Sequence, residues 1–548
     1  MRFLMRSLMR MARGLGTLVG LTVVAAVWAR PPVRTVHRAR PAAAALAASQ
    51  FGKVSFPTSC AAAVQGTIEK GVALLHSFQY QQAEQTFAEA AKQDPQCAMA
   101  LWGKVLSANH QLWDFPDADA LKKGHEELER AEKLGAATPR EREYIAAAAA
   151  FYRDDAKLSH NDRRLAYIAA MRDLHAHYPA DTEAAEFYAL SFVALAMDGE
   201  DDLANRKRAI AILEPILRDE PNSPGAAHYL IHAADTPELA EQGLVAARAY
   251  ARIAPDSSHA LHMPSHIFVR LGLWQETIDS NLAASASAAH ATEMHVSDAH
   301  YQTHAMDFLG YAYLQSGQEA KARQLVEELK KVRGLSADDL ADQQALFEAR
   351  NALELHRWKE AASLAVPAVK LRWQDTTYLV RAIGAARSGD VEGARKDAEK
   401  LAECVAARDA QSRKKGYKVL TEEATDRREA EAWLAYAEGR PEDAIVKLRA
   451  AARRQESEHL DSLQMPAREM LADLYVELKR PAEALAEYKA VLAESLNRFD
   501  ALYGAARAAE LAGQSGDAQG YFKQLVAVCA PAADRPELQE ARVHLAQK

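Results

Sequence analysis

The chain has little of what builds cysteine-based sites or low-complexity structure. Its 548 residues include four cysteines, and no two of them form a Cys-x-x-Cys pair, which leaves cysteine zinc sites, thioredoxin chemistry and c-type haem attachment without support. Glycine (25) and proline (20) are sparse, which excludes collagen-like and low-complexity chains. Two interpretations of Cys60 and Cys97 stay open: a disulfide in an oxidising compartment, or two small buried side chains.

Motifs of several common enzyme classes are also missing. The sequence contains no Gly-x-x-x-x-Gly-Lys-Ser/Thr phosphate loop, no Gly-x-Gly-x-x-Gly after a strand, and no Gly-x-Ser-x-Gly nucleophile elbow. A His-Glu-x-x-His zinc motif is absent as well. Nucleotide binding of these types and serine hydrolase chemistry therefore have no support.

Basic residues are scarce outside the amino terminus. Residues 1–40 hold eight arginines and no acidic residue, which leaves 59 basic side chains against 75 acidic ones in the rest of the chain. The excess of acidic side chains in this part of the chain repels the phosphate backbone of nucleic acids, so we expect no nucleic-acid partner.

The amino terminus has the pattern of a secretory signal. Residues 1–13 are basic, residues 14–29 form an apolar run, and Val27 and Ala29 stand at the −3 and −1 positions of a cut after Ala29. Sixteen apolar residues are few for a spanning helix, so an uncleaved anchor is the weaker interpretation, and it is the only contact with a membrane that we expect. We expect a signal peptide or anchor over residues 1–29, a flexible linker over 30–55, and an exported protein. In a bacterium it would be periplasmic or anchored at the outer side of the inner membrane.

The remaining residues are rich in alanine, leucine and glutamate and poor in strand formers, which predicts a mostly helical chain. They also repeat at a period of 34. In a frame that starts at Val64, Gly71, Ala83 and Phe87 take positions 8, 20 and 24, and frames that start at Met465 and Phe499 place small and aromatic residues in the same way.

This pattern resembles the tetratricopeptide repeat, in which small residues let two antiparallel helices approach closely and an aromatic side chain fills the gap between them. The resemblance covers most of residues 60–530 and implies an all-α fold, an α-solenoid of stacked helix-turn-helix repeats with a concave groove. We expect a histidine-rich array over residues 56–334 and a second array over 335–548. In the family, the first helix of each repeat lines the groove, mainly with positions 2, 5, 9, 12 and 13, and the groove holds extended or helical peptides.

Histidine is concentrated in one part of the chain. Nine of the 19 histidines lie between His228 and His304. His228 and His232 are four residues apart, His262 and His266 repeat that spacing, and the second pair follows the first by 34 residues. Residues four apart share a helix face, and equivalent faces of neighbouring repeats adjoin, so the four imidazoles should form one patch.

Further candidates take groove positions in the same frames. They are His259, His304, Asp235, Asp307 and Arg270, with His300 just before its frame, and His76 and His110 at position 13 of earlier repeats. His76 joins the patch only if the superhelix curls back. Pro264 falls between His262 and His266, so that the helix either starts late or kinks there.

Imidazole-rich sites on helices hold transition metals, and this set predicts one or two ions of zinc, copper or iron, which the sequence does not distinguish. Asp235 and Asp307 would act as ligands or accept ring N–H groups, and Arg270, His76 and His110 would face the groove and its substrate. The segments around these histidines also resemble a group of exported bacterial tetratricopeptide proteins without an assigned activity. We therefore expect a groove metal site, with turnover left open; the alternative is a periplasmic scaffold that binds a protein or peptide.

Overall fold

A computed structural model gives the structure of the chain. It describes residues 50–108, 116–153, 157–197, 202–293, 299–414, 424–457, 463 and 465–546. Within these ranges the regular structure is helical throughout and no β-strand forms. None of the described helices combines the length and apolar character that crossing a membrane demands. The expected signal segment, residues 1–29, and most of the expected linker lie outside the described residues.

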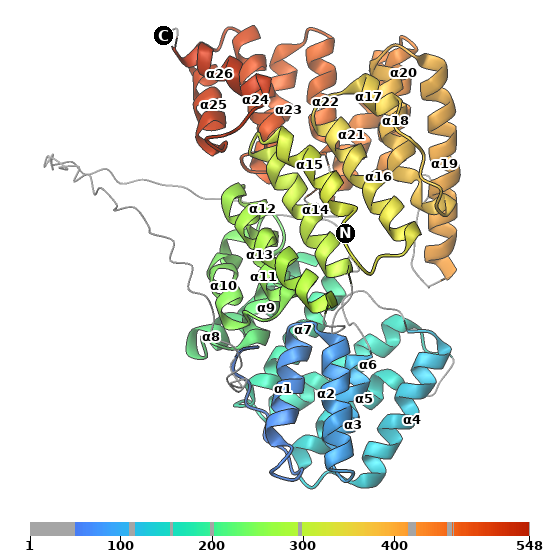
Figure 1. The fold of residues 1–548 in the computed structure, drawn as a ribbon, viewed down its shortest axis with the longest axis vertical. Helices are drawn as coiled ribbons and strands as arrows, with labels where there is room; N and C mark the ends of the chain where they lie inside the picture. The colour runs from blue at the N-terminus through green and yellow to red at the C-terminus, as the bar shows by residue number, and fades with distance from the viewer. Residues whose placement is uncertain are drawn as a thin grey trace, which may run out of the picture. The chain divides into compact units, whose positions relative to one another are not determined.

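The helices of the amino-terminal part pack in successive antiparallel pairs (Figure 1). They are α1 (Gln65–His76), α2 (Tyr80–Gln93), α3 (Ala98–Ser107), α4 (Ala118–Leu134), α5 (Pro139–Tyr152), α6 (His160–His177), α7 (Thr182–Met197), α8 (Asp202–Asp219), α9 (Pro224–Ala234), α10 (Ala240–Ile253), α11 (Ser258–His262), α12 (Pro264–Arg270), α13 (Trp274–Glu293), α14 (His300–Gln315) and α15 (Glu319–Leu329).

The same pairing continues to the carboxy terminus. The remaining helices are α16 (Ala337–Glu354), α17 (Trp358–Ala362), a 3-10 turn η1 (Leu371–Trp373), α18 (Asp375–Arg387), α19 (Val391–Lys414), α20 (Thr425–Ala437), α21 (Pro441–Ser457), α22 (Ala467–Glu477), α23 (Pro481–Glu494), α24 (Phe499–Leu511), α25 (Ser515–Val528) and α26 (Pro536–Ala546). The predicted fold class, an all-α tetratricopeptide-like solenoid, is confirmed.

The first repeats show why the small residues recur. The ring of Phe87, which is fully buried on α2, lies against Gly71 of α1 and Gly103 of α3. A Cβ atom would stand 2.6 Å from that ring at position 71 and 2.3 Å from it at position 103, so only glycine lets the three helices approach this closely. Cys60 and Cys97, which flank the first helix pair, are joined by a disulfide.

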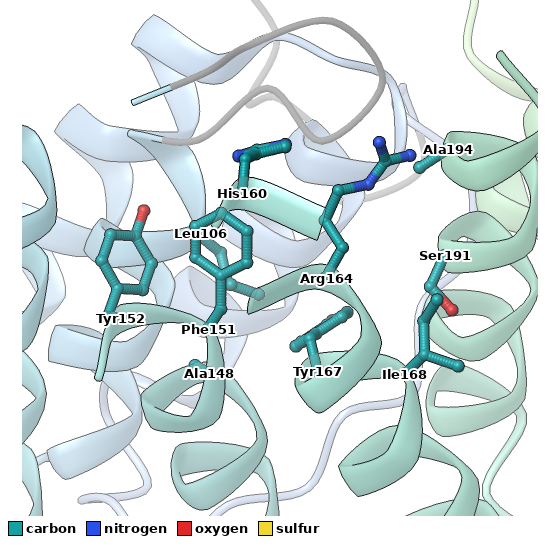
Figure 2. A pocket seen from close by; sticks show the side chains of 10 residues that line it. All are labelled: Leu106, Ala148, Phe151, Tyr152, His160, Arg164, Tyr167, Ile168, Ser191 and Ala194. Atoms are coloured by element: carbon teal, nitrogen blue, oxygen red, sulfur yellow. The ribbon is translucent and has the colours of Figure 1, made fainter. Parts of the chain in front are cut away.

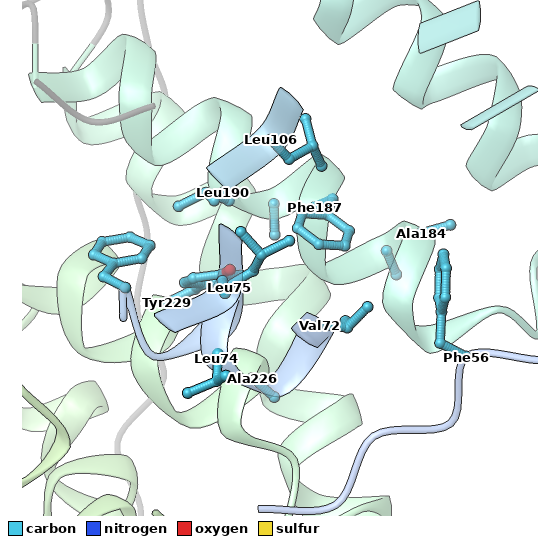
Figure 3. Close-up of a cluster of buried hydrophobic side chains, with 14 of the residues drawn as sticks. Phe56, Val72, Leu74, Leu75, Leu106, Ala184, Phe187, Leu190, Ala226 and Tyr229 are labelled. Atoms are coloured by element: carbon cyan, nitrogen blue, oxygen red, sulfur yellow. The ribbon is translucent and has the colours of Figure 1, made fainter. Parts of the chain in front are cut away.

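The first turn of the superhelix closes on itself. Helix α1 packs against α9 as well as against its sequence neighbours α2 and α3. Figure 3 shows the cluster that forms where α1, α7 and α9 meet, with Leu75 of α1, Phe187 of α7 and Tyr229 of α9 turned toward one another. This closure places the carboxyl end of α1 beside the middle of α9, which are 152 residues apart in the chain.

A buried ion network joins helices of the carboxy-terminal part to α14. Arg498, which precedes α24 and is fully buried, donates to the carboxylates of Glu354 and Glu469 at 2.8–2.9 Å and to the Tyr311 hydroxyl at 3.0 Å. Both carboxylates are shielded from water, with side-chain exposures of 1% and 0%. A pair of buried anions around one buried cation is stable only while all partners remain.

This network yields a stability prediction. Arg498→Met leaves two buried carboxylates without their counter-ion and should cost about 3–5 kcal/mol. Lys489→Met, which removes the exposed ion pair with Asp517, should cost less than about 1 kcal/mol. Denaturant unfolding followed by circular dichroism compares the two variants, and equal midpoints would contradict the role given to Arg498.

Candidate metal centre

A break in the repeat after α10 shapes the site. Where other repeats begin with one continuous helix, this one has the five-residue α11, then Met263, then α12 with Pro264 at its first position. Proline has no backbone N–H to continue the intrahelical hydrogen bonds, so the helix is broken at this position. His262 therefore ends one helix and His266 lies in the first turn of the next, and the two rings meet edge to face with centroids 5.0 Å apart.

Six of the predicted histidines gather into two sets of three. We call His228, His232 and His259 the first histidine set, and His262, His266 and His304 the second histidine set. Within each set, one nitrogen from every ring lies within 4.8 Å of the other two. The sets adjoin, because the ring centroids of His259 and His262 are 6.2 Å apart and those of His232 and His266 are 6.1 Å apart.

The first histidine set is enclosed. His228 and His232 come from one face of α9 and His259 from α11, and all three are buried. The Nε2 atoms of His228 and His259 are 3.0 Å apart. The other nitrogen of His228, Nδ1, lies 2.5 Å from the backbone oxygen of His76, which can only accept, so Nδ1 carries the proton. In the neutral ring, Nε2 then presents a lone pair to His259.

The second histidine set opens toward solvent. His262 is buried, His266 is half-buried and His304, from α14, is exposed. Asn281 of α13 uses its amide nitrogen to donate to the Thr277 carbonyl, so its oxygen accepts from His262 Nδ1 at 2.7 Å. This arrangement turns the lone pair of His262 Nε2 toward the Nε2 atom of His266, 3.1 Å away.

Asp235 orients the facing ring of the second histidine set. It follows α9, and its carboxylate accepts from His266 Nδ1 at 2.9 Å and from Arg270 Nε at 2.8 Å. Burial raises the pKa of the Asp235 carboxyl, but Arg270 and His266 outweigh that effect and hold it well below its usual value. With Nδ1 held by this carboxylate, the His266 ring turns Nε2 toward His262, as ligand histidines do when a carboxylate holds the outer ring nitrogen.

Burial keeps these imidazoles neutral. It lowers the pKa of His228, His232, His259 and His262 well below the ordinary value, and positive charge on neighbouring imidazoles lowers it further. Neutral imidazole is the form that binds metal, so near neutral pH no proton has to be displaced from these four rings.

Each set has its own phenylalanine. The Phe78 ring lies with its centroid 4.3 Å from that of His228 and 5.6 Å from those of His232 and His259. Phe308, on the second set, lies 4.7–5.3 Å from the rings of that set. Phe78 holds a left-handed backbone conformation, with φ of 52°, which is costly for an aromatic residue and is retained where the surrounding packing fixes it.

Other predicted site residues lie beside the two sets. Arg270 is paired with Asp235 and supports His266 through that carboxylate. Asp307 is paired with Arg350 and belongs to neither set. His300 begins α14, is exposed, and also belongs to neither set. His76 reaches the first set through its backbone oxygen, while its ring contacts two glutamates. His110 lies outside the described residues.

Sequence reasoning missed the side chains that hold the rings. Asn281 lies on the second helix of its repeat, which the groove pattern does not include, and nothing in the sequence distinguishes it. Phe308 follows His304 by four residues, one helical turn, and that spacing was a usable signal.

A separate pocket lies among α3, α5, α6 and α7 (Figure 2). Apolar side chains such as Phe151 and Ile168 form much of its wall, with Arg164 and His160 beside them, and its volume is small, about 30 Å³. None of the six clustered histidines lines it, so it is distinct from the two histidine sets.

The position of Asp235 leads to a prediction about metal affinity. Asp235→Asn weakens the acceptor for His266 Nδ1 and leaves Arg270 without its ion pair, so affinity for metal should fall about 10–100-fold. Asp307→Asn is the matched control, because that carboxylate pairs with Arg350, and its affinity should stay near that of the unchanged protein. Competition with a chromophoric chelator measures both, and equal affinities would show that Asp235 does not support a ligand.

Comparison with known proteins finds distant structural similarities and no sequence relative. No protein-family model matches the chain, and no curated protein matches it. Among solved structures, the chain is similar to a tetratricopeptide repeat protein from Parabacteroides merdae, at 14% identity over 53% of this chain and 97% of that one, with a TM-score of 0.30.

Two further similarities cover more of the chain. A chain of the APC/C hetero-tetramer Cut9-Hcn1 matches at 11% identity over 88% of this chain and 96% of that one, with a TM-score of 0.28. The human IFIT1 dimer with PPP-AAAA matches at 13% identity over 84% of this chain and 95% of that one, with a TM-score of 0.36. At these values the similarities carry no argument, and both the fold and the function are argued from the chain's own residues.

Proposed function

We propose that the protein is an exported metalloprotein whose solenoid wall holds a two-ion centre, one ion in each histidine set. The observation that carries this proposal is the approach of facing Nε2 atoms at 3.0 Å in the first histidine set and 3.1 Å in the second, where the partners of Nδ1 hold the rings of His228, His262 and His266 with Nε2 turned inward. Two lone pairs at that distance repel unless a proton or a metal ion lies between them. Metal–nitrogen bonds of 2.0–2.1 Å in a tetrahedral site place neighbouring nitrogens roughly 3.3 Å apart, close to what these rings already have.

The types of ligand limit which metal ions the two histidine sets can bind. Six imidazoles without a thiolate favour zinc, copper or iron over magnesium or calcium. Bound in the second histidine set, such an ion supplies activation of water or dioxygen. His304 is the exposed residue of the second histidine set, while Phe78 packs over the His228 ring of the first. We therefore assign any exchange of an external ligand to the second set and a supporting role to the first.

Export is supported by two features of different kinds. The amino-terminal residues carry the three-part pattern of a signal, and the disulfide between Cys60 and Cys97 suits an oxidising compartment. Both imply that the centre is loaded outside the cytoplasm or during export.

The carboxy-terminal array supports a second candidate function, the binding of a protein or peptide segment. Four buried polar atoms on successive first helices, or at the ends of those helices, have no hydrogen-bond partner among the described residues. They are His356 Nε2, Arg387 Nη1, Trp433 Nε1 and Asp473 Oδ2. Asp473 Oδ2 lies 3.7 Å from the His356 nitrogen and 3.8 Å from the Arg387 nitrogen. A polar group of a bound peptide, or an ordered water, would bridge these gaps.

Metal content tests the main proposal directly. The exported protein should contain at least two equivalents of zinc, copper or iron by elemental analysis. A variant with both His262→Ala and His266→Ala should lose about one equivalent, because two of the three ligands of the second set are gone. Oxidase and hydrolase screens on the loaded protein then separate an enzyme from a storage protein.

The matched control is His177→Ala, because that imidazole is exposed and bonds only to Glu143 among the described residues. It should keep the full metal content. A folded, metal-free protein that takes up no transition metal after purification would refute the centre and leave the peptide-binding scaffold.

The export proposal has its own test. Expressed in a bacterium, the protein recovered from the periplasm should begin at Arg30 by mass spectrometry, because the signal is cut after Ala29. Protein that stays in the cytoplasm with its amino terminus intact would contradict export.

A further inference from the structure

A second kind of metal-ligating cluster lies next to the first histidine set. His76 ends α1, and Glu183 and Glu186 lie one helical turn apart on α7. His76 Nε2 is 2.6 Å from Glu183 Oε2 and 3.4 Å from Glu186 Oε2. We call these three residues the His76 cluster; one potential ligand atom of each lies within 4.8 Å of the other two, and all three residues are buried.

The outer oxygens of both carboxylates are already occupied. Glu183 Oε1 accepts from the Ser55 backbone N–H at 3.3 Å. Glu186 Oε1 accepts from the Ser223 hydroxyl and from the Ala226 N–H at the start of α9. These bonds turn both Oε2 atoms toward His76 Nε2. Glu186 Oε2 is buried and has no hydrogen-bond partner among the described residues.

The contacts of the His76 ring orient its Nε2 atom toward the same two carboxylates. His76 Nδ1 lies 2.9 Å from the Tyr229 hydroxyl, and the ring stacks on Phe187 with centroids 4.9 Å apart. When Nδ1–H donates to that hydroxyl, Nε2 presents its lone pair between the two carboxylates. Figure 3 shows Phe187 and Tyr229 within the apolar cluster that surrounds this place.

Either protons or a cation balance the cluster. Burial raises the pKa of Glu183 and of Glu186 to about 8 and lowers the pKa of His76, so without a cation both carboxyl groups keep a proton near neutral pH. A divalent cation among the three ligand atoms would displace these protons and stabilise both carboxylates. Gly225 leaves the necessary space, because a Cβ there would stand 2.1 Å from Glu186 Oε2 and 2.6 Å from His76 Nδ1.

We propose that the His76 cluster binds one divalent cation, held by His76 Nε2, Glu183 Oε2 and Glu186 Oε2. One imidazole with two carboxylates is a harder ligand set than six imidazoles, and it suits manganese, iron(II) or zinc rather than copper(I). The ion joins α1 to α7. Since the backbone oxygen of His76 accepts from His228, the same ion fixes one wall of the first histidine set. The proposal stands whether or not the two histidine sets hold metal.

Manganese(II) alone is the probe, because imidazole sites bind it more weakly than the later transition metals. Metal-stripped full-length protein is titrated with Mn²⁺, and free Mn²⁺ is followed by its electron paramagnetic resonance signal. The expected result is one bound equivalent, with at least a tenfold loss of affinity in Glu183→Gln and in Glu186→Gln. Glutamine keeps an oxygen for the Ser55, Ser223 and Ala226 donors, so both variants should fold.

Two controls separate this site from others. Glu141→Gln changes a buried glutamate that accepts from Ser59 and caps α5, and it should leave Mn²⁺ affinity unchanged. The variant with His262→Ala and His266→Ala should also bind Mn²⁺ as before, which distinguishes this site from the two-ion centre. Spin-echo modulation from one imidazole nitrogen on bound Mn²⁺ is expected in the unchanged protein, and this readout needs no variant.

Three results would overturn the proposal. They are absence of Mn²⁺ binding, affinity that Glu186→Gln does not alter, and binding that disappears with His262 and His266. The first would mean that the cluster is balanced by a shared proton.

Discussion

The packing of α1 against α9 is the contact on which the first histidine set and the His76 cluster depend. It brings the backbone oxygen of His76 within 2.5 Å of His228 Nδ1 and so fixes the tautomer of a ring in the first histidine set. It also brings Phe78 over that set and places the His76 cluster beside it. An open solenoid, in which each repeat meets only its neighbours, would provide none of these contacts.

The two histidine sets are alike in ligands and different in surroundings. Each has three imidazoles, a pair of close Nε2 atoms and one phenylalanine, but only the second has an ionised carboxylate behind a ring and an exposed member. An ion without anionic ligands in a buried place retains its full charge, which favours ions of low charge or a firmly enclosed structural role. The more open, carboxylate-supported set is the better place for chemistry with an external molecule.

The sequence predicted the fold and much of the candidate site, because both depend on periodicity. Two His-x-x-x-His pairs one repeat apart had to form a patch once the 34-residue repeat was recognised, and the structure places these four rings together. The division into two sets had no sequence signal, since it depends on the helix break at Met263 and on Asn281 from another helix. The sequence also could not predict which residues surround His76. Those contacts depend on the closure of the superhelix, which results from small rotations summed over several repeats.

Anomalous diffraction from crystals of the exported protein, recorded above and below the absorption edges of zinc, copper and iron, tests the central claim most directly. The account predicts a peak within coordination distance of His228, His232 and His259 and another within that distance of His262, His266 and His304. Crystals of metal-supplemented protein that show no peak at either set, with the facing nitrogens bridged by a proton or by water, would contradict it.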